Sequence, residues 1–353
     1  MEFIPMLKDA VEKQASDIFI VSGIPVSYKL NGTIKPQNEE IILPEISEQL
    51  LTEAYRIADR DISRLRTNGD DDFSISIKGL SRFRINAYKQ RGSLAAVIRL
   101  VAFDVPDPKE MSIPEGVMCV AEKTKGLVLV TGPAGGGKST TLACIIDKIN
   151  RTRNNHIITL EEPIEYLHKN NKSIISQREI HADTEGYVTA LRASLRQSPD
   201  VILVGEMRDF ETIKTAMTAA ETGHLIISTL HSVGSANTID RIIDVFPPNQ
   251  QQQIRVQLSQ LLQTVISQQL IPTVDGKLIP AFEIMHCNSA IRNMIRESKI
   301  HQIDNAINSF SSEGMISMDN YLINLQKKGI ISYETVIKFS LNSESVERKI
   351  SNS

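Results

Sequence analysis

Hydrophobic and polar residues alternate along three stretches near the N-terminus of the chain. These stretches are Asp72–Ile77, Arg82–Tyr88 and Ala95–Leu100. Because successive side chains of a strand point to opposite faces, this period of two predicts three strands of an antiparallel sheet. A helix is expected over residues 7–14, a strand over 18–21, and a hairpin where residues 26–30 meet Asn31-Gly32, a dipeptide typical of tight turns. Residues 1–100 are therefore predicted to form a small α/β domain.

Prolines follow this domain. Pro106, Pro108 and Pro114 lie within residues 101–115, which contain few periodic hydrophobic positions. Because proline restricts the backbone, this segment is predicted to be a semi-rigid linker.

Strands and helices alternate in the next predicted domain, residues 116–270. Four short apolar runs indicate buried strands at 126–131, 157–160, 201–204 and 225–229. They predict a mostly parallel sheet with helices on both faces and active groups at the carboxyl ends of the strands. The chain from residue 271 to 353 is predicted to be helical, over 289–298, 301–309, 317–327 and 333–341, with a polar tail over 342–353 that frays.

The most informative motif lies between the strand at 126–131 and the helical stretch that starts at Thr140. It reads Gly132-Pro133-Ala134-Gly135-Gly136-Gly137-Lys138-Ser139 and fits the phosphate-binding loop G-x-x-x-x-G-K-[ST]. Glycines let backbone N–H groups turn inward around phosphate oxygens, and the following helix directs its positive end toward them. Residues 132–140 are therefore the predicted nucleotide site.

Two side chains of this loop have specific expected roles. Lys138 should place its charge between the β- and γ-phosphates, and the Ser139 hydroxyl should bind Mg²⁺, which prefers oxygen ligands. A glycine-rich turn that binds nothing is the alternative, but it does not explain why Lys138 and Ser139 complete the motif.

Carboxylates follow two of the predicted strands. Glu206 comes after the strand at 201–204, a position where P-loop NTPases hold Mg²⁺ or polarise the attacking water. Many buried strands end in glutamate, so it is the phosphate-binding loop upstream that favours this role. Glu161, Glu162 and Glu165 follow another strand. One of them could act as a general base, and a solvated acidic turn is the alternative.

Histidines and arginines near the ends of strands are weaker candidates. His224 and His231 bracket the strand at 225–229, where a structural histidine is the commoner case and a γ-phosphate sensor is the alternative. Arg82, Arg84 and Arg99 belong to predicted strands of the first domain, where arginine normally faces solvent. A role on a neighbour's nucleotide would require an oligomer.

Composition narrows the class of protein. The chain has 353 residues, a net charge of −3 and no long basic run, which disfavours a nucleic-acid partner. Its three scattered cysteines, Cys119, Cys144 and Cys287, provide neither a disulfide framework nor a zinc motif and fit a reducing cytosol. No stretch approaches 18 apolar residues and no signal-peptide pattern begins the chain, so no membrane span is expected.

Four segments share their pattern with a known family. They are Thr159–Glu165, Ile202–Asp209, Ala220–His231 and Ala290–Glu297. In this order they resemble the Asp box, the Walker B segment, the His box and the C-terminal signature of the type IV pilus retraction ATPases, the PilT group of the secretion ATPase superfamily. Without that family, the last segment would indicate only an amphipathic helix.

The chain departs from the family pattern at a few positions. Glu162 stands where the Asp box usually has aspartate, which keeps the charge and lengthens the reach. Ala134 and Gly136 replace threonine and serine in the loop, which removes hydroxyls but keeps the backbone cradle. Met294 replaces a leucine of similar volume.

The resemblance implies a role for each candidate residue. Glu165 would be the general base for water, and Glu206 would hold Mg²⁺ and its waters. His224 and His231 would report the nucleotide state.

The resemblance also implies an assembly. Arg84 and Arg99 would match arginines that reach a nucleotide at the domain or subunit boundary. The implied fold is a PAS-like N-terminal α/β domain and a RecA-like P-loop ATPase domain with C-terminal helices, and six chains would form a ring. The ring would hydrolyse ATP in the cytoplasm at the inner face of the cell membrane, dock on an inner-membrane platform protein and drive pilin removal.

Three other functions compete with a retraction motor. A pilus assembly or type II secretion ATPase usually carries a four-cysteine zinc motif and extra N-terminal domains, and neither is found in this sequence. A RecA-like nucleic-acid translocase is disfavoured by the net charge of −3 and by the lack of a basic aromatic stretch. A non-hydrolysing regulator is disfavoured because Lys138, Glu165 and Glu206 are all present.

Overall fold

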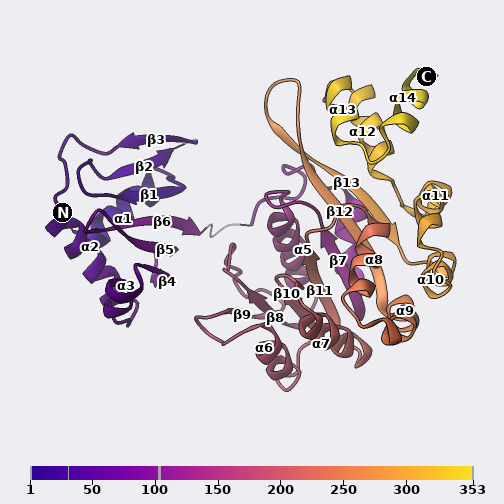
Figure 1. Ribbon diagram of the computed structural model, residues 1–353, viewed down its shortest axis with the longest axis horizontal. Helices are drawn as coiled ribbons and strands as arrows, with labels where there is room; N and C mark the ends of the chain where they lie inside the picture. The colour runs from indigo at the N-terminus through magenta and orange to yellow at the C-terminus, as the bar shows by residue number, and fades with distance from the viewer. Residues whose placement is uncertain (1, 31, 102–104, 352–353) are drawn as a thin grey trace. The chain divides into compact units, whose positions relative to one another are not determined.

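The computed structural model describes residues 2–30, 32–101 and 105–351. Two compact units make up the chain (Figure 1). The first comprises Met1–Asp104 and Glu165–Leu167, and the second comprises Val105–Ile164 and His168–Ser353. No helix in the described ranges is both long and apolar enough to span a bilayer.

The first unit is an antiparallel sheet with helices packed on it. Its elements are α1 (Phe3–Glu12), β1 (Asp17–Ile20), β2 (Ser27–Leu30), β3 (Thr33–Pro36), α2 (Pro44–Ile57), α3 (Ser63–Asn68), β4 (Asp70–Ile77), β5 (Ser81–Gln90) and β6 (Ser93–Val101). The strands lie in the order β3-β2-β1-β6-β5-β4, and each neighbouring pair is antiparallel. The three strands predicted from alternation are confirmed as β4, β5 and β6.

Alternation in this sheet separates a core face from a polar face. Phe83 and Ile85 of β5 are buried with Leu7 of α1 and Leu51 of α2 in one hydrophobic cluster. The helix predicted at 7–14 is present but begins four residues earlier, at Phe3. The predicted hairpin is formed by β2 and β3, and Asn31 of its turn falls outside the described residues.

The second unit is built on a seven-stranded sheet in the order β13-β12-β7-β11-β10-β8-β9. Its strands are β7 (Gly126–Thr131), β8 (His156–Glu161), β9 (Ile174–Glu179), β10 (Val201–Val204), β11 (Leu225–Leu230), β12 (Leu262–Pro272) and β13 (Leu278–His286). All neighbours are parallel except β12 and β13. The mostly parallel sheet predicted from the apolar runs is confirmed.

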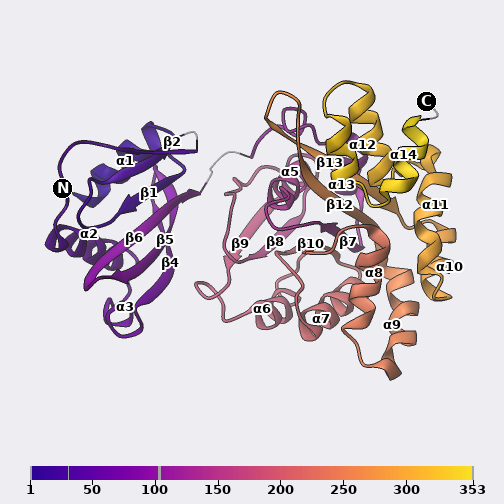
Figure 2. The same ribbon diagram turned by 45° about the horizontal axis from the view of Figure 1, so that its top comes forward.

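Helices cover both faces of this sheet, as predicted. The α-helices are α4 (Glu115–Met118), α5 (Lys138–Thr152), α6 (Tyr187–Ser194), α7 (Phe210–Glu221), α8 (Ser235–Asp244), α9 (Pro248–Leu261), α10 (Ser289–Arg296), α11 (Ile303–Ser309), α12 (Met318–Lys327), α13 (Tyr333–Phe339) and α14 (Ser343–Ser351). Val128 and Val130 of β7 pack with α5, while Leu127 and Leu129 pack in the cluster that includes α6 to α11 (Figure 2).

The prediction of an all-helical region from residue 271 is wrong at its start. β12 runs to Pro272 and β13 follows at Leu278–His286. Six consecutive residues of β13, from Pro280 to Met285, are buried, so this strand has no polar face. A strand that is buried on both faces lacks the alternation that identifies strands in a sequence. The four helices predicted farther on are confirmed as α10 to α13.

The polar tail is also more ordered than predicted. Residues 343–351 form α14, and Val346 is fully buried in a cluster with α12 and α13. Val346 and Ile350 are the two apolar side chains of this polar helix, which is too few to give a clear periodicity, so the sequence pattern missed the packing. Residues 352–353 fall outside the described residues.

A partly buried histidine in the second unit predicts acid sensitivity. The backbone N–H of His168 donates to Gln177 Oε1 at 2.8 Å, and the ring Nδ1 is buried with no hydrogen-bond partner in the described part of the chain. Burial disfavours the charged ring and lowers the pKa of His168 to about 4.

We expect stability to fall below pH 6.5, because the unfolded chain then takes up a proton at His168 that the folded chain refuses until about pH 4. Between pH 7 and pH 5 this proton uptake lowers the free energy of unfolding by roughly 2 kcal/mol. His168→Gln should remove that part of the loss, measured by urea unfolding of the full chain at both pH values. The exposed His301→Gln serves as control, and an equal acid loss in wild type and His168→Gln would contradict the prediction.

Candidate nucleotide-binding site

The phosphate-binding loop connects β7 to α5. Lys138 is the first residue of α5, and Gly137 before it has φ +81°, a conformation that favours glycine. The Lys138 side chain is 9% exposed, and its Nζ donates to the carbonyl oxygens of Gly132 (2.9 Å) and Pro133 (2.8 Å). The ammonium is therefore held inside the loop, at a place where phosphate oxygens can replace these carbonyls.

Strand β12, the neighbour of β7, packs closely against the loop. A Cβ on Gly132, which has φ +139°, would lie 2.0 Å from the backbone oxygen of Gln268. A Cβ on Gly137 would lie 2.8 Å from Gln268 Nε2, and Thr141 Oγ1 donates to Gln268 Oε1 at 2.7 Å. Gln268 is thus part of the site. Sequence reasoning missed it because no motif marks this glutamine and its strand shows no alternation.

Glu206 and His231 meet beside this loop. β10 and β11 are parallel neighbours, with Val204 opposite Ser228, so the residues that follow them share one edge of the sheet. Glu206 Oε2 lies 3.1 Å from His231 Nε2, and Glu206 Oε1 lies 2.5 Å from Arg208 Nε. The backbone N–H of Gly132 donates to the carbonyl of Leu230 at 3.3 Å. The predicted carboxylate and one predicted histidine therefore lie next to each other at the carboxyl edge.

Tyr187 of α6 is a further residue at this edge that the sequence did not reveal. A Cβ on Gly205 would lie 2.9 Å from Tyr187 Oη, so glycine leaves room for the phenol. Burial raises the pKa of Tyr187, and the negative charges of Glu162 and Glu206 raise it further. The phenol remains a neutral group beside carboxylates over the whole physiological pH range.

The carboxylates at the end of β8 have different hydrogen-bonding partners. Glu161 Oε1 accepts from Thr159 Oγ1 at 2.6 Å, and Glu162 Oε1 lies 3.3 Å from His181 Nε2. Glu165 is exposed and belongs, with Tyr166 and Leu167, to the first compact unit. Its role as general base stays a prediction.

His224 is not brought to the loop within one chain. It precedes β11, whereas the site lies after this strand, and six residues of strand span roughly 20 Å. Its Nδ1 lies 3.0 Å from both Thr222 Oγ1 and the carbonyl of Ala219, and its carbonyl accepts from Gly126. A role in nucleotide sensing therefore stays a prediction that this chain alone does not support.

Arg84 and Arg99 lie opposite each other on β5 and β6 of the first unit. Arg84 makes a two-point ion pair with Asp72, with Nε–Oδ1 at 3.1 Å and the second contact at 2.5 Å. Arg99 Nε donates to the buried Asp17 at 3.0 Å. Both arginines are thus engaged with carboxylates of their own sheet, and their action on a nucleotide stays a prediction.

A cavity of about 230 Å³ opens beside the loop. Gly137 and Thr140 line one side, and Met111, Ile113 and Leu270 provide apolar walls. Its size and apolar character suit a flat aromatic ring, as nucleobase sites require.

Ser139 of the loop and Glu206 after β10 provide oxygen atoms suited to binding a cation. Ser139 is the second residue of α5, and Glu206 presents a carboxylate that is 14% exposed. Mg²⁺ is usually held by one or two protein oxygens, with phosphate and water completing its shell, and this donor set fits that pattern.

A protein-family model described as "Type II/IV secretion system protein" matches residues 2–315. The chain belongs to this family. The match covers the sheet of the first unit, the phosphate-binding loop, and the segments with Glu206 and His231.

Individual relatives agree over nearly the whole chain. The chain is 43% identical over 336 residues to "Type IV pilus retractation ATPase PilT" of Pseudomonas aeruginosa, covering 95% of this chain and 96% of that one. It is 45% identical over 309 residues to "Twitching motility protein" of Neisseria gonorrhoeae, covering 87% and 83%. A crystal structure of the pilus retraction motor PilT with bound ADP superposes with a TM-score of 0.90 at 43% identity, covering 99% of both chains. The recognised family and the predicted fold class are thus confirmed.

The contact between Gly132 and β12 generates a prediction. Gly132→Ala should weaken ADP binding more than about tenfold, because its Cβ would press on the Gln268 backbone. Gly276→Ala is the matched control: it has φ +79° and open space around the Cβ position but lies outside the loop, so strain of about 1 kcal/mol is its only cost. Fluorescent ADP titration measures both variants, and equal affinities would contradict the steric argument.

Proposed function

We propose that this chain is a Mg²⁺-dependent ATPase that powers type IV pilus retraction. The main support is the arrangement of two features at the carboxyl edge of the sheet. Lys138 is buried in its loop, and Glu206 contacts His231. The identity of 43% to a named retraction ATPase, over nearly the full length of both chains, supports the choice of function.

The loop would bind the phosphates and the apolar cavity would take the base. Backbone N–H groups of Gly132–Ser139 and the start of α5 surround the phosphates, and Lys138 moves from the loop carbonyls to the phosphate oxygens. Ser139 and Glu206 would hold Mg²⁺, which neutralises charge on the phosphates when bound. His231 contacts Oε2 of Glu206 and would thereby orient the carboxylate.

Glu165 would take the proton of the attacking water. Its exposure leaves the carboxylate available, and the resemblance of Thr159–Glu165 to the Asp box supports this role. Positioning and charge stabilisation of the γ-phosphoryl group supply the rest of the rate.

Movement would come from an assembly of six chains. Closure of the first unit against the next motor domain, about residues 101–115, would convert hydrolysis into motion. In this assembly Arg84 and Arg99 exchange their carboxylate partners for a nucleotide, and His224 reports nucleotide state across subunits. The ring would act at the cytoplasmic face of the inner membrane on a platform protein and remove pilins.

The role of Glu165 can be tested by removing its basicity alone. Glu165→Gln should keep ATP binding within about threefold and lower turnover about 100-fold or more, because general-base catalysis supplies a factor of this size. Phosphate release with and without EDTA also tests the need for Mg²⁺. The exposed Glu185→Gln should behave as wild type. Near-normal hydrolysis by Glu165→Gln would remove it from this role.

The direction of pilus movement can be tested in the source organism. Deletion of the gene should leave cells with more surface pili and no surface motility, because pilins are then added and not removed. Complementation by Lys138→Ala should fail, since nucleotide binding is lost. Cells without pili would instead indicate an assembly ATPase, and stimulation of turnover by single-stranded DNA would indicate a translocase.

A further inference from the structure

A buried carboxylate outside the nucleotide site joins two helix N-termini. Glu283 of β13 is 1% exposed. Its Oε1 accepts from the backbone N–H of Ser235 at 2.7 Å, and its Oε2 accepts from the backbone N–H of Met318 at 3.4 Å. Ser235 is the first residue of α8 and Met318 is the first residue of α12. One side chain therefore anchors two helices that are 83 residues apart in sequence.

Two helix N-termini surround the carboxyl group of Glu283. Burial raises the pKa of Glu283, and the hydrogen bonds from Ser235 and Met318 oppose this shift. Within the described ranges, no ion pair to a cationic side chain is formed by Glu283. The two N-termini supply partial positive charge and N–H donors instead. α8 has Gly234 at its N-cap and no side-chain cap, so Glu283 takes over the function of a capping residue from another strand.

α8 is the helix that follows the His231 loop, residues 231–234. The backbone N–H of Gly234 donates to Ser267 Oγ at 2.9 Å, next to Gln268 under the phosphate-binding loop. Thr238 Oγ1 lies 3.4 Å from Thr131 Oγ1, immediately before Gly132. The start of α8 is thus hydrogen-bonded to β12 and β7, the two strands beside the phosphate-binding loop, and four residues connect it to β11.

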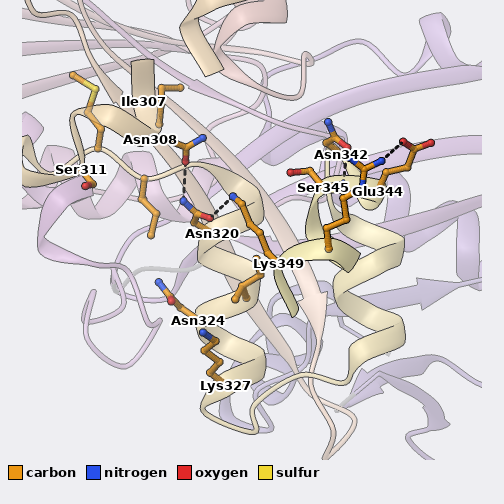
Figure 3. Close-up of a pocket in the computed structure, with 14 residues that line it drawn as sticks. Ile307, Asn308, Ser311, Asn320, Asn324, Lys327, Asn342, Glu344, Ser345 and Lys349 are labelled. Atoms are coloured by element: carbon orange, nitrogen blue, oxygen red, sulfur yellow. Dashed lines mark hydrogen bonds and ion pairs between the residues drawn. The ribbon is translucent and has the colours of Figure 1, made fainter. Parts of the chain in front are cut away.

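The start of α12 is hydrogen-bonded to neighbouring helices. Ser317 Oγ donates to Asn308 Oδ1 at 2.8 Å, Asn320 Nδ2 donates to the same oxygen at 2.7 Å, and Lys349 Nζ donates to Asn320 Oδ1 at 3.1 Å. Figure 3 shows Asn308, Asn320 and Lys349 along one wall of the groove between α11, α12 and α14. Helices α11 and α14 therefore hold the N-terminus of α12, to which Glu283 is bonded.

We propose that Glu283 is a positioning residue for ATP hydrolysis: it ties the start of α8 to α12 and thereby holds His231 against Glu206. The inference rests on the proposed hydrolysis at the Glu206 site. Through Glu283, the C-terminal helix α12 would then influence the geometry of that site.

Glu283→Gln tests this connection with almost no change in shape. The amide keeps one acceptor but presents a donor to the second N–H, so one helix N-terminus loses its anchor. We expect kcat to fall roughly tenfold while KM for ATP changes less than about threefold, because misplacement of His231 affects the reacting geometry more than phosphate binding.

A double-mutant cycle with His231→Ala separates positioning from general destabilisation. If Glu283 acts through His231, Glu283→Gln should change kcat less than about twofold in the His231→Ala background. The control is Asn150→Ala, a buried polar residue that bonds to Lys169 and Asn171. Its effect on kcat should be the same factor with and without His231. A full tenfold loss by Glu283→Gln in the absence of His231 would overturn the inference.

Hydrogen exchange provides a readout that does not depend on turnover. In Glu283→Gln, backbone amides of residues 231–238 and 317–320 of the full chain should exchange faster than in wild type, and unchanged exchange at 231–238 would refute the anchor. If Glu283→Gln does not fold, Glu283→Asp keeps the charge with shorter reach and enters the same cycle. Wild type without turnover would refute the proposed function, whereas active wild type with an equally active Glu283→Gln would refute only the inference.

Discussion

The parallel register of β7, β11 and β10 is the constraint on which the site depends. Thr131 pairs with Leu230, and Ser228 pairs with Val204, so three chain segments leave the sheet at the same edge. Hydrogen bonding between the strands determines this alignment, and the apolar side chains on both faces prevent a shift by one residue. The phosphate-binding loop, His231 and Glu206 meet because of this register, although up to 99 residues separate them in sequence.

Close packing under the loop is the second requirement. β12 lies against β7 and brings the Gln268 backbone so near to Gly132 that no side chain fits between them. The glycines of the motif therefore serve two purposes: they free N–H groups for phosphate and they allow a strand to pass directly beneath. Residues with no motif of their own thus determine the shape of the nucleotide site.

The two compact units divide the candidate residues between them. Lys138, Ser139, Glu206 and His231 belong to the second unit, and Arg84 and Arg99 belong to the first, where each is paired with an aspartate. In the proposed assembly, this division would make hydrolysis depend on the meeting of residues from both units. Glu283 adds a connection of another kind, between the site and the C-terminal helices within one unit.

The sequence by itself determined the strands of both sheets that alternate or end in a motif, the loop from Gly132 to Ser139, and the carboxylate of Glu206 after β10. These features are local, because backbone periodicity and a glycine-rich turn need only neighbouring residues. It did not reveal β12 and β13 as strands, Gln268, Tyr187 or the capping by Glu283. Only the tertiary structure decided these, because burial on both faces erases periodicity and because contacts between distant segments leave no spacing to recognise.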